Sequence, residues 1–116
     1  MKQINPLTFD ALSRGNKLRD ERHYKEWPNW TATDWACALA GEVGEACNKV
    51  KKLRRLKGVY NVALARSLYH EEIATELADA VIYADILAQH LGFNLGEVIR
   101  QKFNEVSDRE GCDVKL

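Results

Sequence analysis

Residues 71–91 read EEIATELADAVIYADILAQHL, and this stretch decides the fold class of the chain. It contains neither Gly nor Pro, and its composition, rich in Ala and Leu, favours an α-helix. Gly92 follows at once, and Gly is the preferred residue just past a helix end. The pattern predicts a helix over about 68–91, with Ser67 as its N-cap and Glu71 in its first turn.

A second long helix is predicted over residues 32–57. Thr31 and Asp34 have the spacing of a capping box, and the far end is rich in Lys and Arg, which suit the C-terminus of a helix dipole. Gly58 is the expected end. Apolar residues recur at steps of three and four, as a buried stripe requires: Trp35, Leu39, Val43, Ala46, Val50 and Leu53.

Two shorter helices complete the expected set. Residues 6–25 carry a moderate apolar side, and the EWPNW turn at 26–30 separates them from the next helix, because a proline disfavours helical conformation in the residue before it. At the other end, Asn94 and Glu97 give a cap pattern for a helix over 94–109, with Leu95, Val98, Ile99, Phe103 and Val106 expected to face inward.

The fold class expected from this order is all-α, a small four-helix bundle. The chain of 116 residues forms one domain: residues 1–30 are an N-terminal helix and turn, 31–110 the helical domain and 111–116 a loose tail. Four helices in a chain of this size leave a limited core, which favours a homo-oligomer.

The charge balance and the apolar content of the sequence indicate which binding partners and which cellular compartment to expect. The formal net charge is zero, with 17 basic and 17 acidic residues, so we expect no nucleic-acid and no membrane partner. No apolar run approaches the roughly 20 residues that span a bilayer, and no signal-peptide core stands at the N-terminus, so the cytoplasm is the expected location. The three cysteines lack a CxxC spacing, and we expect Cys37 and Cys47 to be buried thiols rather than zinc ligands.

Two acidic pairs carry most of the functional information. Glu42 with Glu45, and Glu76 with Asp79, are each spaced i, i+3, so each pair directs two carboxylates to one spot, with Cβ atoms about 5–6 Å apart. Both pairs stand among apolar residues, where a carboxylate loses hydration at a cost of several kcal/mol unless something offsets it. Either these side chains are solvated, or they share a site with a hard cation.

The sequence of the third helix supports the hypothesis of a cation site. Glu72, Glu76, Asp79 and Tyr83 follow at steps of four, three and four, and no Lys or Arg occurs over residues 72–99. Because like charges at this spacing repel, this face lacks local neutralisation, and an external cation would supply it. Donors that are all oxygen suit Mg²⁺ or Mn²⁺, and the absence of Glu-x-x-His motifs argues against a di-iron protein. Since Mg²⁺ commonly shares its coordination with substrate phosphates, a phosphate-bearing substrate is expected.

The motifs GEVGEACNKVKK at 41–52 and EEIATELADAVIYADILA at 71–88 resemble the MazG family of all-α nucleoside triphosphate pyrophosphohydrolases. The resemblance extends from about Asp34 to Arg109. It implies cleavage between the α and β phosphates, to a monophosphate and pyrophosphate, by a dimer or a dimer of dimers. The family's ExxE and ExxD motifs supply its metal ligands, which correspond here to Glu42, Glu45, Glu76 and Asp79.

The same resemblance implies that Tyr83 lines the nucleotide pocket and that Lys102 meets the phosphates. Gly41 departs from the family pattern, because many relatives have a further Glu there, and the segment between the two motifs is long. Any role of that Glu in activating water is therefore absent or moved. We assign the orientation of the attacking water to Glu45 or Glu72.

Aromatic and basic residues near the first motif are the remaining candidates. Trp27 and Trp30 could stack on a nucleobase, whereas the helical phase of Trp35 favours core packing. Lys49 stands four residues after Glu45 and could contact phosphate. The basic run 49–57 as a whole is expected to be a solvated helix end.

The function predicted from the sequence is a Mg²⁺-dependent (Mn²⁺ possible in its place) pyrophosphohydrolase that converts a (d)NTP to a (d)NMP and pyrophosphate. Two alternatives stay open. One is a non-enzymatic helical interaction module with solvated acids, and the other is a related dimeric dUTPase or phosphoribosyl-ATP hydrolase. The nucleobase, the sugar and the choice between homodimer and homotetramer are not specified by the sequence.

Overall fold

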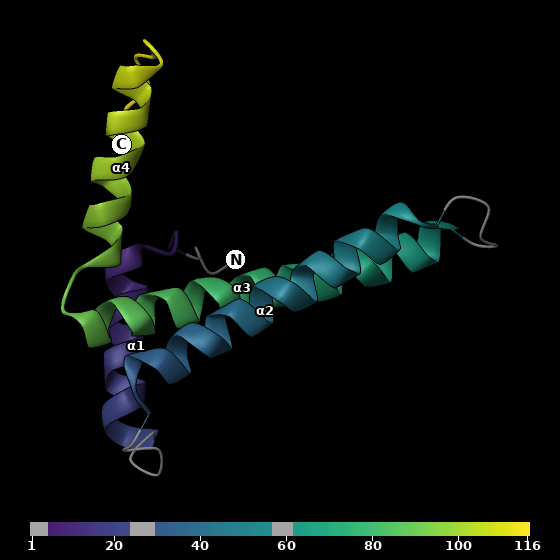
Figure 1. Ribbon diagram of the computed structural model, residues 1–116, viewed down its shortest axis with the longest axis horizontal. Coiled ribbons are helices and arrows are strands. Elements are labelled where there is room, and N and C mark those ends of the chain that lie inside the picture. Colours follow the sequence, from purple (N-terminus) through teal and green to yellow (C-terminus); the bar gives the residue numbers. More distant parts are fainter. Residues whose placement is uncertain (1–4, 24–29, 57–61) are drawn as a thin grey trace. The chain divides into compact units, whose positions relative to one another are not determined.

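The computed structural model describes residues 5–23, 30–56 and 62–116. Its helices are α1 (Phe9–His23), α2 (Ala32–Arg54), α3 (Val62–Leu91) and α4 (Leu95–Arg109), as Figure 1 shows. No described residue lies in a strand, so the all-α class and the four helices are confirmed. The chain divides into two compact units, Trp30–Ala84 and Met1–Asn29 with Asp85–Leu116.

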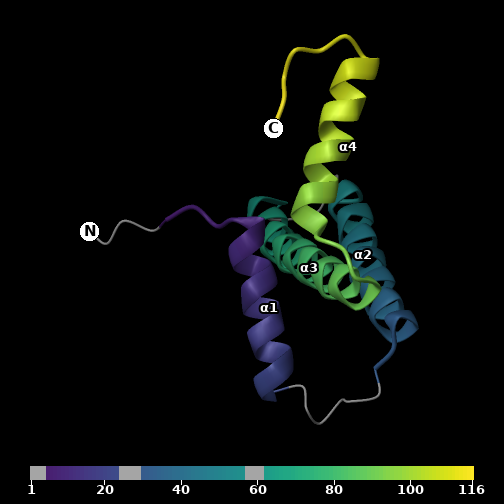
Figure 2. The same ribbon diagram turned by 90° about the vertical axis from the view of Figure 1, so that its left-hand side faces the viewer.

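The Trp30–Ala84 unit is an antiparallel pair of helices, α2 and the first part of α3, which lie side by side in both views (Figures 1 and 2). Each helix turns one stripe toward the other, at steps of three and four residues, similar to a coiled coil. On α2 the buried or half-buried stripe is Trp35, Leu39, Glu42, Ala46, Lys49 and Leu53. On α3 it is Val62, Ala65, Tyr69, Ile73, Glu76, Ala80 and Tyr83. Three of these stripe positions hold charged residues.

The predicted start of α2 is confirmed. The Asp34 N–H donates to the Thr31 hydroxyl at 3.4 Å, and the Thr31 N–H donates to the Asp34 carboxylate at 2.7 Å, which completes a capping box. The helix ends at Arg54, with Arg55 as its C-cap, earlier than the expected residue 57. Gly58, the expected end, lies outside the described residues.

The start of α3 corrects the prediction. The helix begins at Val62 rather than near 68, so Ser67 is an interior residue and not the N-cap, and the first turn holds no acidic residue. The physical reason is packing, because Val62 and Ala65 extend the stripe that continues through Tyr69.

The end of α3 is as predicted. Gly92 has φ 85°, in the left-handed region that glycine tolerates. The Phe93 N–H donates to the Ala88 carbonyl and the Gly92 N–H to the Gln89 carbonyl, both at 3.1 Å. This pair of bonds is a Schellman motif, which satisfies carbonyls that the helix would otherwise leave open.

The other unit contains α1, the last turns of α3 and α4, and a buried carboxylate joins α1 to α3. Asp85 is 1% exposed and accepts from the Ser13 hydroxyl at 2.5 Å, from the Asn16 amide at 2.8 Å and from the Gln89 amide at 2.9 Å. The Gln89 amide also donates to the Ser13 carbonyl at 2.9 Å. Three donors offset the lost hydration of Asp85, and two of them fix α1 against α3.

Helix boundaries in this unit are set by short polar side chains. Thr8 caps α1, since its hydroxyl accepts from the Ala11 N–H at 3.1 Å, so α1 begins at Phe9 and not at residue 6. The predicted Asn94 cap of α4 is confirmed, because its side chain accepts from the Glu97 N–H at 3.0 Å.

The C-terminal residues 111–116 have no helix. The Leu116 N–H donates to the Asn104 side chain of α4 at 2.8 Å, and Lys115 forms an ion pair with Asp108. Val98 and Phe103, expected to face inward, are exposed.

The cysteine prediction was wrong. Cys37 and Cys47 are both exposed. The reason is that α2 buries only the stripe that faces α3, and both thiols lie off that stripe. At about 100° per residue, Cys37 lies 200° and Cys47 120° around the helix axis from Trp35. None of the described helices is long and apolar enough to cross a bilayer.

Candidate metal centre

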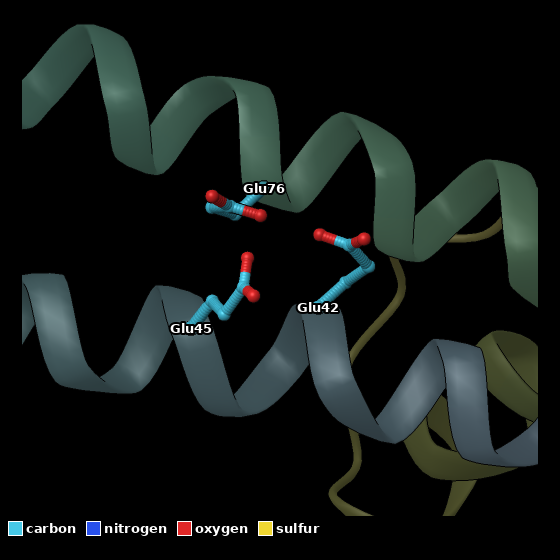
Figure 3. A group of neighbouring side chains, drawn as sticks. All are labelled: Glu42, Glu45 and Glu76. Atoms are coloured by element: carbon cyan, nitrogen blue, oxygen red, sulfur yellow. The ribbon is translucent and has the colours of Figure 1, made fainter.

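Three glutamates of the two motif helices converge between α2 and α3. Figure 3 shows the side chains of Glu42 and Glu45 rising from α2 toward Glu76 of α3. One carboxylate oxygen from each lies within 4.8 Å of the other two. The sequence predicted that these residues share a site, and three of its four proposed metal ligands are brought together.

Their positions follow from the register of the two helices. Glu42 and Glu76 both occupy the stripe along which α2 and α3 face each other, and Glu76 is only 8% exposed. Glu45 is exposed and stands one turn beyond Glu42. Asp79 is half-buried one turn beyond Glu76 and is not among the three converging residues.

Lys49 supplies a positive charge that the sequence reading of this face did not foresee. Its ammonium donates to a Glu76 carboxylate oxygen at 2.5 Å and lies 3.8 Å from a Glu72 oxygen. The expectation that the α3 face lacks local neutralisation is therefore wrong. α3 itself has no cation there, but α2 delivers one from across the interface, which spacing along α3 alone cannot reveal.

Neighbouring charges and hydrogen bonds shift the pKa values of these carboxyls. The hydrogen bond with Glu76, followed by burial and by the charges of Glu76, Glu45 and Asp79, raises the pKa of Glu42 to about 7. The same bond, followed by the one from Lys49, lowers the pKa of Glu76. The Glu76 hydrogen bond likewise raises the pKa of Lys49. The Lys49 ammonium balances part of the negative charge of the cluster.

This donor set fits a hard divalent cation. All the converging atoms are carboxylate oxygens, the ligands that Mg²⁺ and Mn²⁺ prefer. The Lys49 ammonium lies beside Glu76, at the place where a cation with charge +2 would also be stabilised. Glu42, Glu45 and Glu76 could hold such an ion, with Asp79 one turn away on the same face of α3 as Glu76.

A cluster of three aromatic rings, which are tilted to one another, lies in the same unit. The ring of Trp35, which is 2% exposed, has its centroid 4.6 Å from that of Trp30 and 5.9 Å from that of Tyr83. The expected core role of Trp35 is confirmed by its burial. Trp30 is partly exposed and Tyr83 is half-buried, so each ring keeps some solvent-exposed surface. Trp27, the other predicted base contact, lies outside the described residues.

Lys102, the predicted phosphate contact at the C-terminal motif, belongs to the other unit. It lies on α4, is exposed, and forms an ion pair with Glu105 at 2.9 Å. The pair is one helical turn apart, an arrangement common on solvated helix faces.

Comparisons of the chain with protein-family models, with curated proteins and with solved structures found no match. What this chain does is therefore inferred from its own residues and their geometry.

Proposed function

We propose that the chain is a Mg²⁺-dependent nucleoside triphosphate pyrophosphohydrolase of the MazG type, converting a (d)NTP to a (d)NMP and pyrophosphate. One observation carries the proposal. Glu42, Glu45 and Glu76, which come from the two motif helices, direct their carboxylates to one place within 4.8 Å. A group of oxygen donors at the interface of two helices suits a hard cation, and such cations in enzymes commonly hold substrate phosphates.

In this proposal Glu42, Glu45, Glu76 and Asp79 hold the metal. When bound, Mg²⁺ neutralises the triphosphate and makes a water molecule more acidic. Glu45 or Glu72 accepts the proton of the attacking water and orients its oxygen toward the α-phosphorus. The bond between this phosphorus and the oxygen that bridges to the β-phosphate breaks, and pyrophosphate leaves.

The cationic and aromatic residues serve binding. Lys49 offsets phosphate charge that develops as pyrophosphate departs. Tyr83 and Trp30 offer ring surfaces to the nucleobase. Stacking contributes about 1–3 kcal/mol per base and acts on substrate and transition state alike, so Trp30→Ala should raise KM more than it lowers kcat.

A panel of nucleotides with separate detection of pyrophosphate and orthophosphate tests the proposal. We expect pyrophosphate and a monophosphate from at least one triphosphate in the presence of Mg²⁺. Asp79→Asn should lose most of the rate, because it alters the charge and position of a ligand together. Glu71→Gln removes an exposed acid of the same helix outside the cluster and is the matched control. Orthophosphate and a diphosphate as products would refute attack at the α-phosphorus.

One observation favours the rival reading, a non-enzymatic helical module. Lys49 neutralises part of the acidic cluster within the chain itself, so the cluster can exist without a metal. The two readings differ in their response to Mg²⁺, since only a metal site gains stability from it. Including dUTP and phosphoribosyl-ATP in the nucleotide panel distinguishes the related hydrolases.

A further inference from the structure

Lys49 is the cation that contacts the candidate metal centre among the residues that the structure describes. Its ammonium lies 2.5 Å from Glu76 and 3.8 Å from Glu72. Its side chain is 26% exposed and that of Glu76 only 11% exposed, so the pair is shielded on most sides. A contact of this length between ionised groups is strong and directional.

The position of Lys49 is unusual for a lysine. It occupies the stripe of α2 that faces α3, between Ala46 and Leu53, where an apolar residue would ordinarily pack. A lysine at such a place needs a partner, because an isolated buried charge is costly. Glu76 provides one, and Lys49 in return compensates a carboxylate that is nearly buried.

A divalent cation bound to Glu76 would be repelled by the ammonium on the same carboxylate. Two positive charges a few ångströms apart repel by an amount that grows as water is excluded, and this site is partly shielded. Metal binding at Glu42, Glu45 and Glu76 therefore requires that Lys49 leave Glu76, or that a second anion neutralise it.

We propose that Lys49 is a tethered competitor for the metal site: its ammonium occupies Glu76 in the metal-free protein, gives way to the divalent cation, and is then captured by a substrate phosphate. This regulation rests on the proposed function. The four-carbon stem keeps the displaced ammonium beside the site, and its partial exposure leaves a path toward a phosphate. Bound metal consequently tightens the binding of the triphosphate. Bound triphosphate tightens the binding of the metal by the same factor.

Calorimetric titration with Mn²⁺ tests the competition without measuring activity. Lys49→Gln keeps a hydrogen-bond donor for Glu76 but removes the charge. We expect it to bind Mn²⁺ at least about 10-fold more tightly than the wild type, a difference of about 1.4 kcal/mol. Lys49→Arg retains the charge and should bind as the wild type does. Lys52→Gln makes the same charge change at an exposed position of α2 that has no ion pair in the described residues, and should also match the wild type.

The outcomes separate this inference from the proposed function. Equal or weaker Mn²⁺ binding by Lys49→Gln, with measurable binding by the wild type, overturns the competition and leaves the metal site standing. If neither protein binds Mn²⁺, both ideas fail. If Lys49→Gln unfolds without metal, Mn²⁺ should restore its fold by taking over the charge of Glu76, and failure to restore it overturns the inference.

A triphosphate with an uncleavable bridge between the α and β phosphates tests the capture. In the wild type we expect this analogue to tighten Mn²⁺ binding, and in Lys49→Gln we expect the tightening to fall at least about threefold, since the phosphate has lost its ammonium partner. Unchanged coupling overturns the capture. An analogue that does not bind the wild type overturns both the capture and the proposed substrate class.

Discussion

At the scale of single residues, Glu42 and Glu76 show how neighbouring carboxyls divide their roles. Glu42 shares a hydrogen bond with Glu76, and the pKa of Glu42 rises to about 7 while that of Glu76 falls. Lys49 stabilises the ionised form of Glu76. The pKa of Glu42 therefore lies above that of Glu76, so Glu42 takes up a proton before Glu76 does as the pH falls.

The raised pKa of Glu42 predicts a pH dependence of stability. Between about 4.5 and 7 the folded protein holds a proton on Glu42 that the unfolded chain releases, so the metal-free protein should lose stability as pH rises through this window. The lowered pKa of Glu76 acts in the opposite direction, but below pH 4.5. Urea denaturation in EDTA at several pH values measures the slope, and Glu42→Gln should reduce it. An unchanged slope in that variant would contradict the assignment to Glu42.

Glu76 predicts a metal-dependent gain in stability. Millimolar Mg²⁺ or Mn²⁺ should raise the melting temperature, because binding to the native state alone stabilises by about 2.7 kcal/mol at a hundredfold excess over Kd. Glu76→Gln should abolish the increase, since Glu76 is the buried member of the cluster. Glu71→Gln, outside the cluster, should keep it. Identical wild-type melting curves in EDTA and in Mg²⁺ would rule out a metal site.

At the scale of elements, short polar side chains decide where the helices begin. Thr31 and Asp34 close a capping box on α2, Thr8 caps α1, and Asn94 caps α4. Each satisfies N–H groups that the helix cannot pair internally. The sequence predicted the Thr31 and Asn94 caps but not the Thr8 cap, and α3 begins at Val62 rather than at the predicted Ser67 cap.

The capping box of α2 predicts a measurable loss on substitution. Thr31→Ala should cost about 1 kcal/mol in the free energy of unfolding, because the Asp34 N–H loses its acceptor. Thr33→Ala changes an exposed threonine two residues further into the same helix and should change stability little. Urea denaturation of both variants checks the difference, and equal stabilities would show that the box contributes nothing.

The left-handed conformation of Gly92 leads to a second prediction at the scale of elements. Gly92→Ala should destabilise the protein by about 1–2 kcal/mol, because φ 85° places a Cβ atom in an unfavourable conformation. Gly15→Ala, inside α1 where a Cβ atom would meet nothing within 4 Å, should instead stabilise it by about 0.5–1 kcal/mol. Opposite signs in thermal denaturation would confirm the Schellman motif, and a stabilising Gly92→Ala would contradict it.

At the scale of the whole molecule, the Trp30–Ala84 unit has little core of its own. Trp35, Ala46 and Ala80 are its buried apolar residues among those described. Several large apolar side chains of the same unit are 44–56% exposed: Val43, Val50, Leu64, Leu68, Leu77 and Val81. A soluble protein usually buries such a surface against another element or another copy.

We therefore expect a homo-oligomer, a homodimer or a homotetramer. For about 100° per residue, Leu77 and Val81 lie 40° apart on one side of α3, so Leu77→Glu with Val81→Glu should weaken an interface formed there. Sedimentation at micromolar concentration measures the assembly of both proteins. The control is Glu71→Lys, a charge change at an exposed residue of α3 that lies away from the side formed by Leu77 and Val81. A monomeric wild type would refute the expectation.

The sequence alone determined the features of this protein that depend on near neighbours. The helical class, the Thr31 and Asn94 caps, the Gly92 end and the placement of the acidic pairs on two successive helices all follow from residues within a few positions of one another. These features could be predicted because helix propensity, capping and i, i+3 spacing are local properties of the chain.

Only the tertiary structure decided the contacts between distant residues. The Lys49–Glu76 pair joins residues 27 apart and the Ser13–Asp85 bond residues 72 apart. The register of α2 on α3 selects which residues meet, and it arises from packing along the whole interface. The same register half-buries Val62 and Ala65, which extends α3 toward the N-terminus beyond its predicted start, and it leaves Cys37 and Cys47 exposed. No local pattern encodes a register, because it is a property of two helices together.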